Sequence, residues 1–394
     1  MLGGEGLEIA VAADFHIGSP FSSLAADIAV RASSLQEQCL REFCQMAGRK
    51  NLPYLLIAGD LFDRLDLPLA LLRRTQQSFS LCPRTKVLIS PGNHDPYFPQ
   101  GIWDDPHWPK NVQVVRTESE VFDFPEHGLR IYSAAFLTQS ARLPVLEKLK
   151  IPVDREKLNL LLLHGEIVAA GQHSNYNPLP REWLRDSGLD LALVGHIHQT
   201  SGLVRESEGF YTLIPGCPMG RGFDECGEKG TYLLRLCKNL QFKQSVLKVE
   251  ASFIPFTAAR FLRLHLDISS FDCESQEELA FAVRRTILEK ARISGEECHS
   301  CLIEAELCGI SELRPDVDFL QRRLRDEFML LRLQDKSFPA FSLAKASEDS
   351  HFSGFLSREY QLLESSGEVD GEILLRCQRL LLSSLAGELH GLLN

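Results

Sequence analysis

The chain has 394 residues, of which 44% are hydrophobic and 24% charged, with eleven cysteines and a formal net charge of −11. This length allows two or three domains, and the acidic balance excludes a protein that coats nucleic acid through bulk positive charge. The odd, scattered cysteines, the absence of an apolar run near ~20 residues and an N-terminus without a basic signal region predict a cytoplasmic protein with no membrane span.

Short apolar runs, each ending in polar residues, recur through the first 250 residues. Runs of this length suit strands that are buried on both faces. Between the first two runs, residues 32–48 place Leu35, Cys39 and Phe43 on one side of a predicted helix. Alternating strands and helices predict an α/β domain. The runs lie at 8–14, 54–60, 86–95, 158–166 and 189–198, and later strands are predicted at 210–216, 231–237 and 245–250.

The pattern changes near residue 253, where a smaller domain is predicted. Residues 260–268 alternate strictly between apolar and polar, which is typical of a half-buried strand. A helix that buries Leu279 follows, then an alternating strand at 302–308 and a helix that Pro315 can open. The predicted domains are 1–250, an α+β cap at 251–336, and a linker with a terminal amphipathic helix (370–393) at 337–394.

Polar side chains stand at the end of each strand of the first domain, and strand ends in an open sheet converge at one edge. Two carboxylates, one amide and four imidazoles suit manganese, iron or zinc better than the all-oxygen preference of magnesium or calcium. Seven ligands exceed what one tetrahedral ion needs, so we expect two ions with Asp60 as the bridge. The candidate ligands are Asp14, His16, Asp60, Asn93, His164, His196 and His198.

The positive charge of two divalent ions would exceed the negative charge of the two aspartates, which leaves a local positive charge that attracts phosphate. An acidic chain can therefore still hold a phosphodiester. Each motif alone also has a structural interpretation, since Asn and Asp are common turn residues. Five such strand ends in one chain favour a metal site.

In chain order, the motifs DFHIG, GDLFD, GNHD, LLHGE and GHIH resemble the calcineurin-like metallophosphoesterases over about residues 8–250. HIGSPF and GQHSNYNPLP resemble more narrowly the SbcD-type DNA-repair exonucleases and their YhaO-like branch. The resemblance implies an α/β fold, a metallophosphoesterase β-sandwich flanked by helices, followed by a small α+β cap domain and C-terminal helices. It implies two ions, with manganese expected and iron or zinc as alternatives. One would be held by Asp14, His16, Asp60 and His198, the other by Asp60, Asn93, His164 and His196.

The same resemblance implies that His94 is the catalytic histidine, with Asp95 orienting its ring. One position departs from the archaeal and eukaryotic relatives, which have a second functional histidine where this chain has Asp63. That role is not carried over to Asp63. His173 is left open between a substrate contact and an ordinary surface loop residue.

The leading interpretation is a dinuclear-metal DNA nuclease, the exonuclease subunit of a repair complex with an SbcC- or YhaN-like coiled-coil ATPase. Homodimer formation is left open. A phosphodiesterase or pyrophosphatase acting on a small nucleotide uses the same motifs, and a scaffold subunit with a relic site is the non-enzymatic alternative. Cys298, Cys301 and Cys308 are interpreted as core thiols, because a zinc site there lacks a clear fourth ligand.

Overall fold

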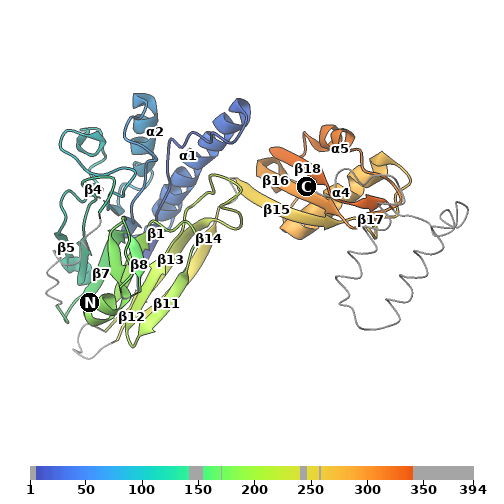
Figure 1. The fold of residues 1–394 in the computed structure, drawn as a ribbon. Coiled ribbons are helices and arrows are strands. Elements are labelled where there is room, and N and C mark those ends of the chain that lie inside the picture. Colours follow the sequence, from blue (N-terminus) through green and yellow to red (C-terminus); the bar gives the residue numbers. More distant parts are fainter. Residues whose placement is uncertain (1–5, 142–153, 170, 240–245, 257–258, 340–394) are drawn as a thin grey trace, which may run out of the picture. The chain divides into compact units, whose positions relative to one another are not determined.

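The computed structural model describes residues 6–141, 154–169, 171–239, 246–256 and 259–339. The chain divides into two compact units, Met1–Phe261 and Leu262–Asn394, whose elements are labelled in Figure 1. The predicted boundary at residue 250 falls inside strand β14 (Lys248–Pro255). The predicted helix at 370–393 lies outside the described residues.

Two six-stranded sheets form the centre of unit 1. In the first sheet, β1, β2, β3 and β4 are parallel neighbours, and β13 and β14 continue the sheet in antiparallel fashion beyond β1. Its strands, in spatial order, are β14, β13 (Gly230–Cys237), β1 (Leu7–Ala12), β2 (Tyr54–Ile57), β3 (Lys86–Ile89) and β4 (Val112–Val114).

The second sheet has a parallel centre and antiparallel edges. Its strands, in spatial order, are β11 (Gly202–Ser207), β12 (Phe210–Ile214), β10 (Leu191–Gly195), β7 (Leu158–His164), β6 (Leu129–Ser133) and β5 (Glu120–Phe124). The short pair β8 (Glu166–Val168) and β9 (Pro178–Pro180) lies outside both sheets.

The two sheets pack against each other through one shared hydrophobic core. Val11 of β1 and Leu56 of β2 belong to the same buried cluster as Leu160 of β7 and Leu193 of β10. Side chains of a strand alternate between its faces, so every second residue of these runs enters this core. The predicted β-sandwich is confirmed. The expectation that the candidate ligands meet at the edge of one open sheet is wrong, because the strands that carry them belong to two sheets.

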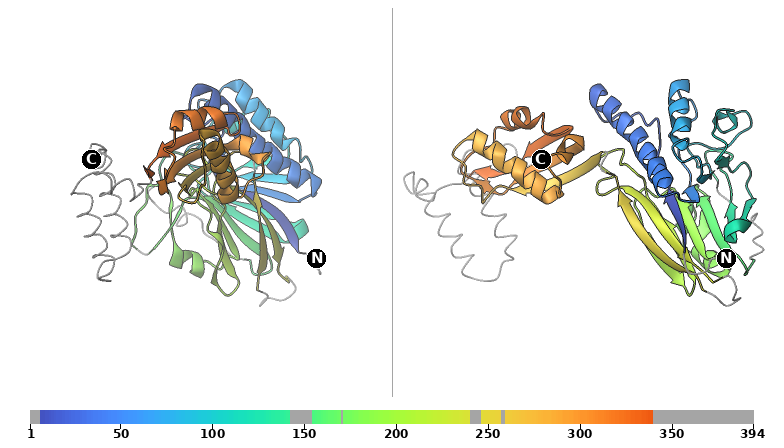
Figure 2. Two further views of the ribbon diagram at one scale, coloured as in Figure 1. Left: turned by 90° about the vertical axis from the view of Figure 1, so that its right-hand side faces the viewer. Right: turned by 180° about the vertical axis from the view of Figure 1, so that it is seen from behind.

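Helices cover the sandwich. The predicted helix at 32–48 is confirmed within the longer α1 (Ala26–Arg49), and α2 (Leu69–Phe79) lies beside it on the same side of the strands, as Figure 2 shows from behind. Helix α3 (Arg181–Asp186) packs Leu184 against Leu161 of the second sheet. None of the helices that the structure describes is long and apolar enough to cross a membrane.

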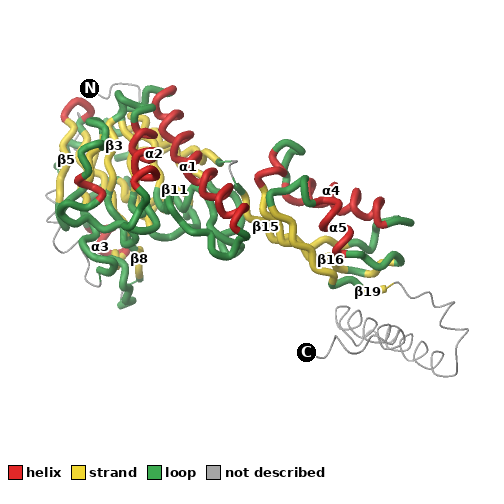
Figure 3. Tube along the Cα trace, turned by 90° about the horizontal axis from the view of Figure 1, so that it is seen from above, coloured by secondary structure: helices red, strands yellow, loops and turns green. Residues whose placement is uncertain are grey.

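Unit 2 is a three-stranded sheet with two helices on one face (Figure 3). Side-chain caps begin both helices, since Ser275 Oγ accepts from the Glu278 N–H and Asp316 Oδ1 accepts from the Phe319 N–H. The predicted strand and helix order is confirmed, with three further strands. The elements are β15 (Arg260–Asp267), α4 (Gln276–Ala291), β16 (Cys301–Cys308), α5 (Val317–Leu324) and β18 (Leu330–Asp335), with the short pair β17 (Ile310–Ser311) and β19 (Phe338–Pro339).

Candidate metal centre

Four of the seven candidate ligands have left-handed backbone conformations. Asp14, His16, Asp60 and His196 have φ values of 54°, 48°, 50° and 99°, and they are four of the nine non-glycine residues with positive φ in the described chain. Such conformations cost free energy and concentrate at functional sites. Here each one turns the chain sharply just after a strand, so that the side chain points to the end of the sandwich.

Hydrogen bonds between the turns hold these corners together. The Asp14 N–H donates to Gly59 O at 3.0 Å, and the His16 N–H donates to Asp60 O at 2.9 Å. Glycine is required where the turns approach most closely, because a Cβ at Gly59 would overlap the His164 ring and one at Gly92 would overlap the Asp60 carboxylate. The glycines of GDLFD and GNHD thus permit the ligands to converge.

One half of the site contains two facing histidines. His16 Nε2 lies 3.0 Å from His198 Nε2, and Asp14 Oδ1 lies 4.0 Å from each of these nitrogens. His198 Nδ1 lies 2.6 Å from Glu225 Oε1. The carboxylate accepts a hydrogen bond from Nδ1–H, so the His198 Nε2 lone pair is directed at His16.

The other half is built around His164. Its Nδ1 donates to Ala58 O at 2.9 Å, so Nε2 faces inward, 2.9 Å from Asn93 Oδ1 and 3.3 Å from Asp60 Oδ2. Asp60 Oδ2 also lies 3.6 Å from His16 Nε2. The Asp60 carboxylate therefore stands between the two halves, in the position predicted for a bridge.

These contacts bring lone pairs together, and such an arrangement requires a cation or a proton between them. Burial lowers the pKa of His164, but the Asp60 carboxylate outweighs burial and raises that pKa to about 9. Burial opposes ionisation of Asp60, yet its histidine neighbours hold the Asp60 pKa well below its usual range. The pKa of Asp14 is raised by burial. The convergent oxygen and nitrogen atoms fit two divalent ions.

His196 contributes differently from the other candidates. Its backbone N–H donates to both oxygens of Asp14, at 3.2 and 3.1 Å. Its ring lies 5.3 Å from that of His164 and 4.6 Å from that of Tyr176, between centroids. The structure therefore places His196 next to the centre, but its ring is in none of the groups of convergent ligand atoms found in the described chain.

His94 lies beside the centre and is 39% exposed at its side chain. Its backbone N–H donates to Asp60 Oδ1 at 2.9 Å, and its Nδ1 donates to the Asp63 carbonyl oxygen at 2.9 Å. The prediction that Asp95 orients this ring is wrong. Asp95 is fully buried and accepts from the backbone N–H groups of Gly92 and Phe62, at 2.7 and 3.0 Å.

Asp95 therefore shapes the GNHD turn, while the Asp63 carbonyl holds the His94 ring, which is the role predicted for Asp95. Burial of the Asp95 carboxyl, with Asp60 nearby, raises its pKa to about 7. Asp63 is the second aspartate of the GDLFD motif, three residues after Asp60, and its place in this motif is the sequence feature that could have indicated its role. The alternation of apolar and polar residues gave no indication of Glu225 or Arg221, which also lie around the centre.

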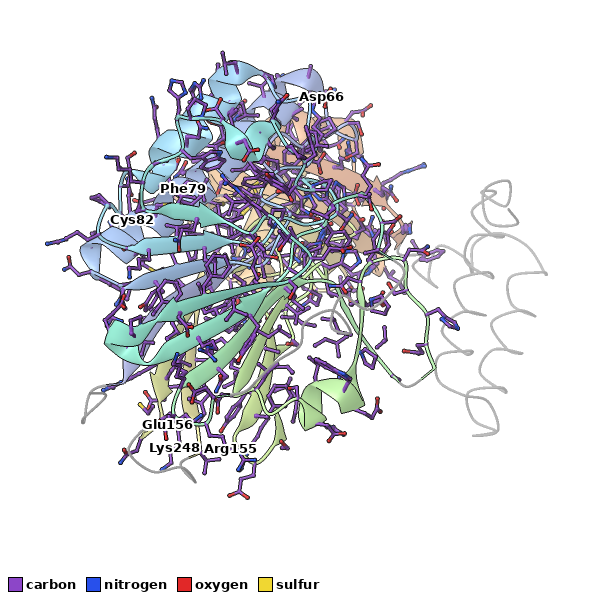
Figure 4. The ribbon with its side chains drawn as sticks, turned by 90° about the vertical axis from the view of Figure 1, so that its left-hand side faces the viewer. Asp66, Phe79, Cys82, Arg155, Glu156 and Lys248 are labelled. Atoms are coloured by element: carbon purple, nitrogen blue, oxygen red, sulfur yellow. The ribbon has the colours of Figure 1, made fainter. Side chains whose placement is uncertain are left out.

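A pocket opens next to His94. Exposed Tyr176 borders it, whereas His173, also exposed, is not among its lining residues. Figure 4 labels Asp66, which lies in the loop after β2 and contributes to this pocket. The lining residues are Asp63, Arg64, Leu65, Asp66, Asn93, His94, Gln139 and Tyr176.

The cysteines of unit 2 form no metal site in the part of the chain that is described. Cys298 and Cys301 are buried in the hydrophobic core of unit 2, and no candidate ligand group includes Cys308. Their interpretation as core thiols agrees with this packing.

Comparison with known proteins supplies the family. Residues 7–200 match the model described as calcineurin-like phosphoesterase. This match covers just under half of the chain. The chain is 30% identical over 235 residues to the uncharacterized metallophosphoesterase YhaO of Bacillus subtilis strain 168, covering 57% of this chain and 56% of the relative. The match thus spans little more than half the length of that curated relative.

Solved structures align with lower similarity. A dimetal phosphatase from Danio rerio is 12% identical with a TM-score of 0.38, covering 64% of this chain and 99% of that one. The protein TT1561 of Thermus thermophilus is 11% identical with a TM-score of 0.36, covering 63% and 99%. Because both TM-scores are below 0.5, the similarity to this family rests on the family model and on the curated relative.

Proposed function

We propose that the protein is a dinuclear-metal-dependent phosphodiesterase that acts on DNA as a nuclease. The observation that carries this proposal is the convergence of acceptor atoms around Asp60, with the half-exposed His94 beside them. Asp14, His16, Asp60 and His198 would hold one ion, and Asp60, Asn93, His164 and His196 the other. Manganese suits these nitrogen and oxygen donors. When bound, the ions would polarise the phosphoryl oxygens.

The geometry around His94 suits proton donation. Because the Asp63 carbonyl accepts from Nδ1, the other ring nitrogen, Nε2, is the one available to a substrate. A protonated His94 can donate from Nε2 to the leaving oxygen while the Asp63 contact holds the ring in place. Asp60 Oδ1 fixes the His94 backbone in turn, so the proton donor and the ligand bridge are kept in register.

A DNA substrate is supported by the resemblance to SbcD-type nucleases and by the pocket beside His94. Tyr176 is 38% exposed there, and an exposed aromatic ring can stack against a base. A phosphodiesterase of small nucleotides is the second candidate, because the same pocket suits a single nucleotide.

We place the protein in the cytoplasm as part of the same proposal, since free thiols such as those of Cys39 and Cys44 lie buried in unit 1.

Parallel hydrolysis assays distinguish these substrates. We expect manganese-dependent cleavage of linear double-stranded DNA as well as of bis-p-nitrophenyl phosphate, and loss of both activities in chelator. Hydrolysis of the small diester alone would favour the small-nucleotide function. Two bound ions without hydrolysis of either substrate would favour the scaffold alternative.

The partner of the nuclease is proposed to be a coiled-coil ATPase of the SbcC or YhaN kind, bound through residues 340–394. The sequence there places Ile373, Leu380 and Leu389 on one predicted apolar stripe, and burial of each such side chain contributes ~1.5–3 kcal/mol. Helices with such stripes commonly dock on partner grooves or coiled coils.

Truncation after Pro339 tests this partner. The shortened protein keeps every residue that the structure describes, so it should still hydrolyse bis-p-nitrophenyl phosphate at the full-length rate but should not co-purify with the ATPase. Full-length His94→Ala is the matched control, because it should lose hydrolysis but retain the partner. Co-purification of the truncated form would refute docking through residues 340–394.

A further inference from the structure

The segment between β12 and β13 holds one candidate ligand, His198, by hydrogen bonds to the backbone carbonyl of His198. The Cys217 N–H and Lys229 Nζ both donate to His198 O, each at 3.1 Å. Gly216 has a φ of +76°, and a Cβ there would lie 2.9 Å from the same oxygen. The chain therefore passes directly against His198 at this point.

The same segment also holds the His198 side chain. Glu225 Oε1 accepts from His198 Nδ1 at 2.6 Å, and Glu225 Oε2 accepts from the Arg221 N–H at 2.9 Å. A carboxylate behind a histidine ligand fixes which nitrogen carries the proton and raises the basicity of the other nitrogen. Glu225 thus directs the His198 Nε2 lone pair toward His16.

Arg221 links this carboxylate to the opposite side of the centre. Its Nη1 donates to Asp63 Oδ1 at 2.8 Å, and its Nη2 lies 3.5 Å from Glu225 Oε1. Asp63 Oδ1 also lies 3.2 Å from His16 Nδ1. The chain of contacts therefore runs from His198 through Glu225, Arg221 and Asp63 to His16, behind both histidines of one half.

Among the described contacts, the His164 ring has no carboxylate hydrogen-bonded to its Nδ1, although Asn177 Nδ2 donates to His164 O at 2.9 Å. His164 Nδ1 donates to a backbone carbonyl, that of Ala58. A backbone group is held by the sandwich itself and does not depend on residues 216–229. The two imidazole rings are therefore oriented in different ways, that of His198 by a side-chain carboxylate and that of His164 by a main-chain carbonyl.

We propose that Glu225 and Arg221 are positioning residues that set the metal affinity of the His16 and His198 half without affecting the His164 and Asn93 half. This inference rests on the ligand set of the proposed function. Loss of a residue that orients a metal ligand typically weakens metal affinity by about 10- to 100-fold. The effect of Glu225 should fall in that range, for one ion only.

Manganese titration of the full-length protein tests the proposal, with bound ions counted by equilibrium dialysis and the paired-ion signal followed by electron paramagnetic resonance. Glu225→Ala should weaken one of two ions about 10- to 100-fold and abolish the paired signal. Glu225→Gln, which keeps an acceptor oxygen, should restore part of the affinity. Arg221→Met should weaken the same ion less, because Glu225 keeps its bond to the backbone N–H of residue 221.

Asp224→Ala is the matched control, since this exposed carboxylate is the chain neighbour of Glu225 and should leave both affinities unchanged. Wild-type affinity for both ions in Glu225→Ala would overturn the inference, and so would equal weakening of both ions. A wild-type protein that binds fewer than two ions would instead refute the ligand set, and the inference with it.

Discussion

Replacing His94 with alanine should lower turnover at least ~100-fold, the usual scale of general acid catalysis, while both metal ions stay bound. The side chain contacts Asp63 through Nδ1, and the contact that supports the bridge comes from the His94 backbone N–H to Asp60 Oδ1. Alanine keeps that backbone bond. Turnover of bis-p-nitrophenyl phosphate and the metal content of the same preparation are the two measurements.

The metal content decides the role of His94, because its ring nitrogen also lies within ligand range of His16 and Asp60. Loss of an ion, with full activity restored at high manganese, would make His94 a ligand instead of the proton donor. His173→Ala is the control, because His173 is exposed and outside the lining of the pocket. It should retain wild-type turnover.

Replacing Asp60 with asparagine should weaken both ions, by at least about tenfold each, or ~1.4 kcal/mol. Asp60 Oδ2 lies 3.3 Å from His164 Nε2 and 3.6 Å from His16 Nε2, so a single carboxylate serves both halves. Asparagine has nearly the same shape but lacks the negative charge that offsets repulsion between two cations.

His16→Ala is the matched comparison for Asp60→Asn. Its Nε2 faces His198, so it should weaken mainly the ion of that half. Metal bound per chain, measured at several concentrations of free manganese, gives the two affinities of each variant. If both variants lose the same single ion and keep the other, Asp60 is not a bridge.

The sequence by itself determined the strands, the five motifs and the residue types of the centre. These features are local, since a buried strand shows as an apolar run and its last residue is known within a few positions. Asp14, Asp60 and His164 could therefore be selected as a set from the polar residues that follow such runs. Their chemistry predicted a transition-metal site before any contact was known.

The tertiary structure decided which groups support that set. Alternation cannot show that β1 and β7 lie in different sheets, because both are mainly apolar runs with nearly all of their residues buried. Nor does adjacency in sequence indicate contact. Asp95, next to His94, turns into the core, whereas Asp63 contacts the His94 ring from 31 residues away.

Two contacts around the centre left no signal in the sequence. Arg221 reaches Asp63 across 158 residues, and Glu225 reaches His198 across 27. A charged residue in a loop has the same sequence signal whether water or a buried partner satisfies it. Only folding two sheets together brings these loops to one end of the sandwich, where burial makes an unpaired charge costly and so selects the pairs that form.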